Sequence, residues 1–405
     1  MRAVSTSPAT RLRALYFLYY GNVGTVLPFF AVYLQGLGFS GKQIGVIQML
    51  PSFPLAPIVA VAWATFADHR ATSERALRLA TSWVAVAVLL LPFARTPAQV
   101  AAVVVLMALG DRAVVPLADS VAIEYCREHC RERSGETPGI SYARIRLFGS
   151  LGFIALTLAV GRLLTMRGGR PADLLVPGTV VVCVAAYALV ARGLPSTPRR
   201  GERPAPREML ALLGDRRLWV LLGPAALHWA ACAPYHVFFG VLVRDLGLRD
   251  DVTSAGMAIG VVAEIAVLLI YPRLERRFPL RTLLAVSFAA SAVRWTLLAR
   301  ASHPLAVAGL QAMHGLTFGL FWGSAMRALA DVVPPRLRAT GQAVFTGVVF
   351  GGANAVGYAL SGVAYDRLGG AGMLFAWAAG VEVVALAALL VLPQTAASSS
   401  SSSRA

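Results

Sequence analysis

The chain has 405 residues, of which 57% are hydrophobic and 14% are charged, and its mean hydropathy is +0.66. Because a soluble domain carries roughly 25% charged residues, this composition excludes an ordinary soluble protein and indicates a membrane protein. The 37 basic residues outnumber the 20 acidic ones, for a net charge of +17. They are scattered between apolar runs and not gathered in one domain, so we expect no nucleic-acid partner.

A membrane-spanning helix needs about 20 mostly apolar residues, and backbone groups in lipid must bond within the helix. The sequence predicts twelve such helices, and hence an all-α polytopic membrane protein. In chain order they cover 14–35, 43–66, 76–95, 98–122, 145–166, 173–193, 217–242, 253–271, 281–300, 304–329, 340–364 and 371–393.

The orientation follows from the basic residues, which accumulate in cytoplasmic loops. With a cytoplasmic N-terminus, 25 of the 37 lie on the cytoplasmic side, nine lie outside and three fall within spans. The loop 162–172, with three arginines outside, is the exception. No cleavable signal is evident at the N-terminus. We expect a multi-pass protein of the cell membrane (the inner membrane of a bacterium) with both termini in the cytoplasm.

A long polar segment rich in Pro and Arg divides the chain into two halves of six spans. The predicted organisation is a six-helix bundle over 1–195, a cytoplasmic linker over 196–216, a second six-helix bundle over 217–395 and a disordered tail over 396–405. Such a repeat of six spans is typical of secondary transporters.

The cysteines give little sign of a metal site. Cys126 and Cys130 flank His129, but no second ligand pair follows, so we expect free thiols, no metal and no cofactor.

Ionisable residues within spans are costly and therefore indicate function or buried pairs. Arg112 and Asp119 are seven residues apart and share one face of the fourth span, while Arg146 and Phe153 share a face of the fifth. An acid opposite a guanidinium and an aromatic ring would bind a polar, ring-shaped solute. The alternative is a structural ion pair between the two helices.

The second half offers Glu264, Arg294 and His314 in spans eight, nine and ten. A carboxyl group whose pKa depends on a movable arginine can take up and release a proton, so these residues are candidates for proton coupling. A static buried network is the alternative. For Glu382 we favour a structural role, and His228 and His236 fit either a direct role or satisfied core positions. After the second span, Asp68 and Arg70 are candidates for a gating loop, with a plain solvated loop as the alternative.

The residues from Tyr142 to Phe153, which read YARIRLFGSLGF, resemble the helix-five signature of the lactose-permease branch of the major facilitator superfamily. That branch includes the phenylpropionate-permease-like and nucleoside-symporter-like transporters. The segment 116–119 and the segment 310–317 are similar to its helices four and ten. The resemblance implies the major facilitator fold and a monomer. It also implies that Asp119, Arg146 and Phe153 occupy substrate positions, and that Glu264, Arg294 and His314 occupy coupling positions.

Several positions depart from that branch. Thr317 stands at the proton-carrying acid, Gln311 at a lysine, and Val267 at a sugar-binding asparagine. His236 and Phe239 stand at two aspartates. A galactoside substrate is therefore not expected, and Glu264 becomes the first candidate for the proton carrier.

The sequence thus predicts a secondary active transporter and no enzyme. The leading hypothesis is proton-coupled symport, by alternating access, of a small polar solute with a ring: an aromatic acid, a nucleoside or a glycoside. Gly347, Gly351 and Gly352 would let helices approach closely. The alternatives are an efflux antiporter for apolar compounds and, from another class, a membrane-embedded sensor or enzyme.

Overall fold

The computed structural model describes residues 7–52, 54–70, 72–132, 141–194 and 213–391, and every regular element within these ranges is a helix. Most of the predicted linker and the predicted tail lie outside the described residues. The extent of the linker, and the domain boundaries that depend on it, stay predictions.

The first half contains the predicted spans one to six. Its helices are α1 (Pro8–Gly36), α2 (Gly41–Met49), α3 (Leu55–Arg70), α4 (Ser73–Ala87), η1 (Val88–Phe93), α5 (Pro97–Glu132), α6 (Tyr142–Met166) and α7 (Leu175–Arg192). Side-chain caps fix several of the starts. Ser40 and Gln43 form a capping box at α2, and Ser141 accepts a hydrogen bond from the backbone of Arg144 at α6.

The second half contains spans seven to twelve. Its helices are α9 (Arg216–Ala231), α10 (Ala233–Asp245), α11 (Asp250–Arg277), α12 (Leu280–Leu298), α13 (Pro304–Gly309), η2 (Leu310–Met313), η3 (Gly315–Leu320), α14 (Phe321–Val332), η4 (Pro335–Leu337), α15 (Arg338–Phe345), η5 (Thr346–Ala353), α16 (Asn354–Leu368) and α17 (Ala371–Val391). The segments η3 and η5 are π-helical and interrupt spans ten and eleven.

Ten of the described helical segments are long and apolar enough to cross a membrane. The two other predicted spans are α12 and the pair α2 and α3. The second span was expected to be continuous from 43 to 66, but α2 ends at Met49 and α3 begins at Leu55. Pro51 and Pro54 lie in this break, where a missing N–H and a fixed φ interrupt helical bonding.

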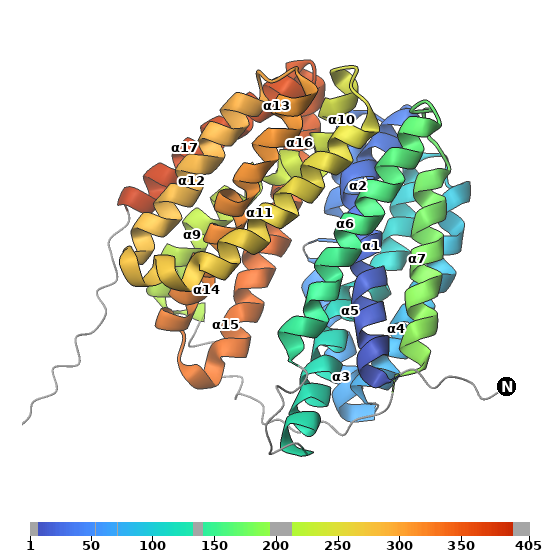
Figure 1. The fold of residues 1–405 in the computed structure, drawn as a ribbon, viewed down its shortest axis with the longest axis vertical. Helices are drawn as coiled ribbons and strands as arrows, with labels where there is room; N and C mark the ends of the chain where they lie inside the picture. Colours follow the sequence, from blue (N-terminus) through green and yellow to red (C-terminus); the bar gives the residue numbers. More distant parts are fainter. Residues whose placement is uncertain (1–6, 53, 71, 133–140, 195–212, 392–405) are drawn as a thin grey trace, which may run out of the picture.

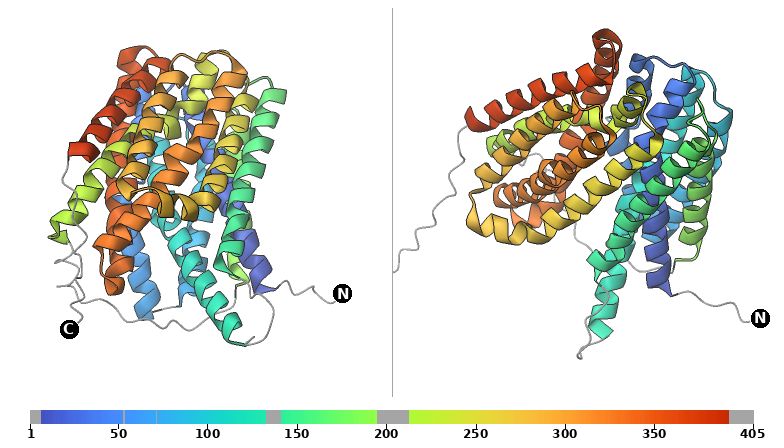
Figure 2. Two further views of the ribbon diagram at one scale, coloured as in Figure 1. Left: turned by 60° about the vertical axis from the view of Figure 1, so that its left-hand side comes forward. Right: turned by 45° about the horizontal axis from the view of Figure 1, so that its top comes forward.

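The helices form two groups that correspond to the two halves of the sequence (Figure 1). They meet at the end where α2, α10 and α16 lie and are farther apart at the end where α1 begins, as the turned views also show (Figure 2). The polar contacts between the halves agree with this arrangement. Hydrogen bonds and an ion pair join the halves at the first of these ends, which we call the closed end.

The central contact of the closed end joins α2 to α16. The Asp366 carboxylate accepts hydrogen bonds from the backbone N–H groups of Gly41 (2.7 Å) and Lys42 (2.8 Å). The first N–H groups of a helix have no intrahelical partner and carry partial positive charge. Asp366 therefore fastens the second half to the start of α2 in the first half.

Glycines allow α2 and α16 to touch backbone to backbone. A Cβ atom on Gly41 would lie 2.7 Å from the Gly362 carbonyl oxygen, and one on Gly45 would collide with the Tyr358 carbonyl. The sequence pointed instead to Gly347, Gly351 and Gly352. A Cβ on Gly347, in the π-helical segment η5, would meet nothing within 4 Å, so this glycine is not needed for a close approach of helices.

Candidate functional site

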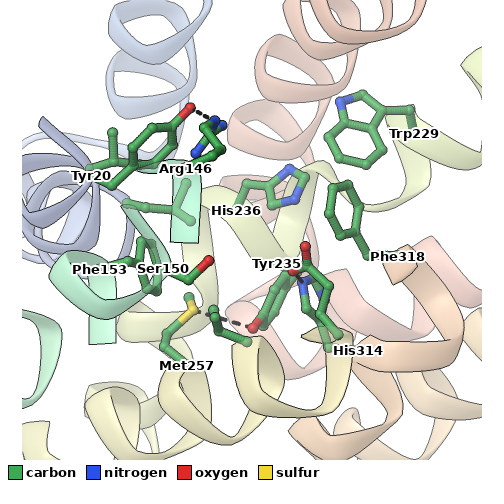
Figure 3. A pocket seen from close by; sticks show the side chains of 14 residues that line it. Tyr20, Arg146, Ser150, Phe153, Trp229, Tyr235, His236, Met257, His314 and Phe318 are labelled. Carbon is green, nitrogen blue, oxygen red and sulfur yellow. Dashed lines mark hydrogen bonds and ion pairs between the residues drawn. The ribbon is translucent and has the colours of Figure 1, made fainter. Parts of the chain in front are cut away.

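A cavity of about 300 Å³ lies between the two halves. The first half contributes side chains from α1 and α6, and the second half contributes side chains from α9, α10, α11, η3 and the residue before η3, His314 (Figure 3). We call it the central cavity. Its lining includes four residues that the sequence singled out as site candidates: Arg146, Phe153, Glu264 and His314.

Arg146 is held in place by tyrosines of α1. Its guanidinium donates a hydrogen bond to the Tyr20 hydroxyl and lies 4.1 Å from the centroid of the Tyr20 ring. Phe153, two helical turns along α6, is only 9% exposed and lines the same cavity. The first half thus presents one cation and one aromatic face to a solute.

Asp119 does not line the central cavity. Its carboxylate accepts hydrogen bonds from the hydroxyl groups of Tyr16 (2.5 Å) and Tyr142 (2.9 Å). The sequence suggested a direct pair with Arg146. Among the described residues these two charges form no ion pair, and Tyr16, whose ring centroid is 5.4 Å from the guanidinium carbon, connects them. Asp119 therefore acts on Arg146 at a distance, through tyrosines.

Arg112 also lies outside the cavity lining. Its side chain is exposed on α5, and its charge acts on Tyr19 of α1 and Tyr358 of α16. It therefore lies within electrostatic range of both halves without contacting the cavity.

The second half places an acid and an imidazole together at the cavity wall. Glu264 Oε2 is 3.5 Å from His314 Nε2, and both side chains are partly exposed. The His314 ring stacks on Phe318 with a centroid distance of 5.3 Å. The stacked ring holds His314 facing Glu264, which is the arrangement needed for proton exchange between the two groups.

Arg294 lies directly behind this pair and is fully buried. One nitrogen, Nη1, donates to Thr317 Oγ1 (2.9 Å) and lies 3.4 Å from His314 Nδ1, and the other donates to Gln311 Oε1. The guanidinium also lies over the Tyr235 ring at 4.3 Å. Within the described residues it contacts no carboxylate, so this buried cation is balanced only by neutral acceptors and rings.

Two further polar side chains line the cavity: His236, for which the sequence left a direct role open, and Trp229, which was not a candidate. His236 Nδ1 and Trp229 Nε1 are buried and have no hydrogen-bond partner among the described residues. Figure 3 shows both side chains at the cavity, with His236 between Arg146 and Phe318. Buried polar atoms are almost always paired, so these two are available to a solute.

The gating candidates cannot be placed in the same detail. Asp68 and Arg70 fall in the last turn of α3, and their side chains lie outside the described residues.

Donor atoms suitable for a metal gather at one place in the described chain. His228, Cys232 and Glu382 offer a nitrogen, a sulfur and a carboxylate oxygen within 4.8 Å of one another, all buried. The candidate pair Cys126 and Cys130 is not part of this group: Cys126 is buried on α5, and the side chain of Cys130 is outside the described residues.

The tyrosines around Asp119 and Arg146 are candidate site residues that sequence reasoning missed. Tyr16 and Tyr20 are four residues apart and so share a face of α1, where they contact Asp119 and Arg146. A cluster of tyrosines at this spacing in an apolar span was the available signal.

Residues 9–377 match the model of a protein family that is described as "MFS_1 like family". The maltose permease of Geobacillus stearothermophilus is 29% identical over 343 residues, covering 82% of each chain. A protein of Escherichia coli K12 named "Probable 3-phenylpropionic acid transporter" is 27% identical over 378 residues, covering 89% of this chain and 92% of its own.

A solved structure supports the same fold. The crystal structure of the nucleoside transporter NupG matches with a TM-score of 0.82, covering 95% of this chain and 98% of that one at 18% identity. At this identity the match establishes the arrangement of helices and leaves the solute open.

Proposed function

This chain belongs to the MFS_1 like family of transporters, and from that premise we propose that it is a proton-coupled symporter of a small polar solute that contains a ring. It is a major facilitator transporter with the twelve-helix fold, and it is not an enzyme. Among its relatives are a maltose permease and a phenylpropionic acid transporter. The candidate solutes are accordingly a glycoside, an aromatic acid and a nucleoside.

The observation that carries the proposal is the composition of the central cavity. One wall has the Arg146 cation and the Phe153 ring, and the opposite wall has Glu264 beside His314. Rings supply stacking surfaces, and charged groups supply directional hydrogen bonds. An efflux pocket for apolar compounds would not need ionisable groups on both walls.

The size of the cavity supports a small solute. Its volume of about 300 Å³ is at the lower end of the range for small-molecule sites, roughly 300–1,000 Å³. One or two rings with polar substituents fit such a space, and a long oligosaccharide does not.

Alternating access requires the two halves to close at one end of the site at a time. At the closed end, Asp366 of α16 binds the start of α2, and Arg162 and Thr165 of α6 contact Asp251 of α11. With the basic loops on the cytoplasmic side, both termini are cytoplasmic and the closed end faces outward. In this proposal the protein works as a monomer in the inner membrane, and its two six-helix bundles rock about the central cavity.

Glu264 is the proposed proton carrier of the cavity, because it faces His314 and, through it, the buried Arg294. The experiment is uptake into liposomes of labelled nucleosides, glycosides and aromatic acids, with and without an inward proton gradient. Uptake of one class should require the gradient, and Glu264→Gln should abolish this requirement while leaving exchange of solute intact.

Glu275→Gln is the matched control. Glu275 lies on the same helix, eleven residues or about three turns further on, and does not line the cavity. Uptake that ignores the gradient in the unaltered protein would refute the coupling and leave a uniporter or an exporter.

A further inference from the structure

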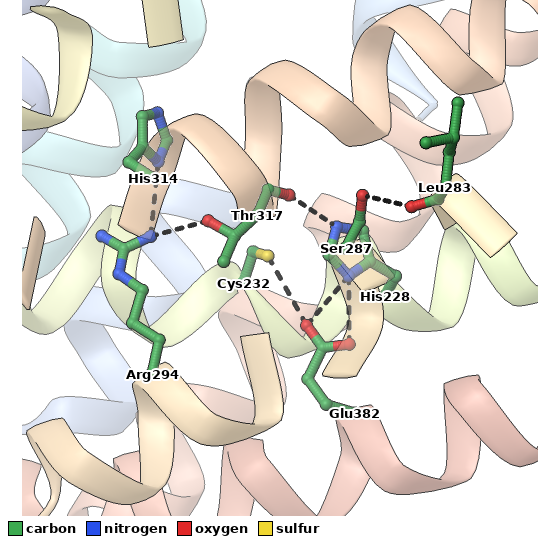
Figure 4. Close-up of polar contacts among 8 residues, drawn as sticks. All are labelled: His228, Cys232, Leu283, Ser287, Arg294, His314, Thr317 and Glu382. Carbon is green, nitrogen blue, oxygen red and sulfur yellow. Dashed lines mark hydrogen bonds and ion pairs between the residues drawn. The ribbon is translucent and has the colours of Figure 1, made fainter. Parts of the chain in front are cut away.

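A second ionisable cluster lies in the second half, behind the central cavity and outside its lining. His228 of α9 and Glu382 of α17 are both fully buried, and Cys232 lies beside them between α9 and α10 (Figure 4). Neither His228 nor Glu382 has a part in the function proposed above.

The hydrogen bonds of His228 determine where its protons are. Nε2 lies 3.1 Å from the backbone carbonyl oxygen of Thr317, which can only accept, so Nε2 carries a hydrogen. Nδ1 lies 2.9 Å and 3.0 Å from the two carboxylate oxygens of Glu382. An unprotonated Nδ1 facing a carboxylate would set two lone pairs against each other in a dry environment. The contact therefore contains one more proton. We place it on the carboxyl group, because this leaves both side chains neutral in a dry environment, where separated charges are costly.

The surroundings exclude water from the pair, so water cannot solvate the carboxylate that loss of this proton would leave. The His228 ring stacks on Phe288 at 4.5 Å and contacts Phe321 at 4.5 Å. The thiol of Cys232 is 3.8 Å from Glu382 Oε1. A buried, unpaired carboxylate is costly, so the arrangement retains its proton.

The other titratable or charged groups that face the pair lie on α10 and α12. His236 of α10 interacts electrostatically with His228, and Arg294 of α12 interacts with Cys232. Trp295 of α12 lies against Glu382. Arg294 is the one permanent charge in this group. If the pair gave up its proton, an unpaired buried carboxylate would remain, because the hydrogen bonds of Arg294 go to Thr317 and Gln311 and not to Glu382.

Thr317 joins the pair to the central cavity. Its carbonyl accepts from His228, and its hydroxyl accepts from Arg294 (2.9 Å), which in turn contacts His314 beside Glu264 (Figure 4). Thr317 belongs to the π-helical segment η3. The altered hydrogen-bond register of such segments is often found at functional sites. A rearrangement of η3 would change both contacts of Thr317 together.

We propose that His228 and Glu382 form a second, buried proton-binding site, whose proton is coupled to the central cavity through Thr317 and Arg294. The coupling rests on the proposed symport, whereas the binding of the proton does not. The donor set of His228, Cys232 and Glu382 would also suit Zn²⁺. We favour the proton because nitrogen and carboxylate are already at hydrogen-bond distance.

Infrared spectroscopy of the full-length protein in lipid, titrated with pH, tests the site with the proton itself as probe. We expect a C=O band from a protonated carboxyl group that persists when the exposed acids have ionised. Glu382→Gln should remove it, and the control Glu275→Gln should leave it. A C=O spectrum that is unchanged by Glu382→Gln would overturn the proposal, as would stoichiometric zinc in the purified protein that is lost on the same substitution.

A second variant tests the coupling. Thr317→Val keeps the backbone carbonyl and removes the hydroxyl that binds Arg294. Glu264→Gln should shift the Glu382 band when Thr317 is present and leave it unmoved in the Thr317→Val background; an equal shift in both would refute the route through Thr317.

The two proposals fail differently. If the band is present but uptake ignores a proton gradient, symport fails and the proton site stands. If uptake is gradient-driven and depends on Glu264 but the band is absent, the proton site fails alone.

Discussion

Tyr16 donates a hydrogen bond of 2.5 Å to Asp119 while its ring lies 5.4 Å from the guanidinium carbon of Arg146. The acid and the base that sequence reasoning paired are thus separated by an aromatic ring. We infer that Asp119 is a positioning residue, because its carboxylate accepts hydrogen bonds from Tyr16 and Tyr142, and the Tyr16 ring lies beside Arg146.

Tyr16→Phe tests this relationship. The substitution keeps the ring beside Arg146 and removes the hydrogen bond to Asp119, a contact with a charged group that is worth roughly 1.5–3 kcal/mol. We expect kcat/KM for uptake to fall about tenfold, with a similar loss in Asp119→Asn. Because the two residues act together, the double variant should lose little more than either single one. Fully additive losses would show that Asp119 acts independently of Tyr16.

Arg146→Lys tests the cation of the first wall. Lysine retains the charge but lacks the planar group that lies over Tyr20 and donates to its hydroxyl. We expect the KM of uptake to rise by about an order of magnitude, because a cation–π contact and a charged hydrogen bond are both lost. Arg144→Lys, at an exposed position two residues away, is the control and should leave KM unchanged.

His236→Phe tests a residue that faces the cavity with an unpaired nitrogen. Phenylalanine fills nearly the same space and cannot form a hydrogen bond. If the solute bonds to Nδ1, its affinity should fall about three- to tenfold, the equivalent of roughly 0.5–1.5 kcal/mol. Competition by solute analogues that each lack one polar group identifies the group that bonds to Nδ1. The analogue that lacks this group should bind equally well to the unaltered protein and to His236→Phe. Unchanged affinity for every solute would assign His236 to packing.

Asp366→Asn tests the closed end. The carboxylate binds two N–H groups at the start of α2, and losing its charge should weaken this state by about 1–2 kcal/mol, or five- to thirtyfold in population. Spin labels on the exposed positions Lys42 and Arg367, in a background without native cysteines, would report a longer distance between the halves. Asp331→Asn, in the exposed pair with Arg327 at the other end, should have no such effect.

Asp173 gives a pH-dependent prediction outside the spans. Burial opposes ionisation of this carboxyl, but the hydrogen bond from Arg167 (2.7 Å) and that from the backbone of Leu175 (2.9 Å) outweigh it and lower its pKa. The stabilisation that the ionised Asp173 provides is therefore fully present above about pH 3.9, the ordinary pKa of aspartate. It is lost as the pH falls through the lower pKa that the carboxyl group has in the folded protein.

Asp173→Ala should therefore destabilise the protein by about 1 kcal/mol at neutral pH, the usual net contribution of a hydrogen bond. The difference in thermal stability from the unaltered protein should shrink below pH 4. A constant difference from pH 7 to pH 3 would show that the side chain stabilises by packing and not by charge.

The spans could be predicted from the sequence because their length and apolarity are local properties. The twelve predicted spans all correspond to helical segments, although Pro51 and Pro54 divide the second. Arg146, Phe153, Glu264 and His314 could be selected because each is an unusual or motif-bearing residue within a span. What the sequence did not reveal are contacts between distant helices. His228 and Glu382 are 154 positions apart, and each looked like an isolated core residue until the fold brought them together.

The backbone contact between α2 and α16 has a practical consequence. Because Gly41, Gly45 and Gly362 leave no room for a Cβ atom, one added methyl group is enough to act as a wedge between the halves. Gly362→Ala alters nothing in the central cavity, yet it makes this conformation harder to form. It therefore offers a way to trap the opposite conformation for crystallography or electron microscopy without a bound solute, an antibody or a cross-link.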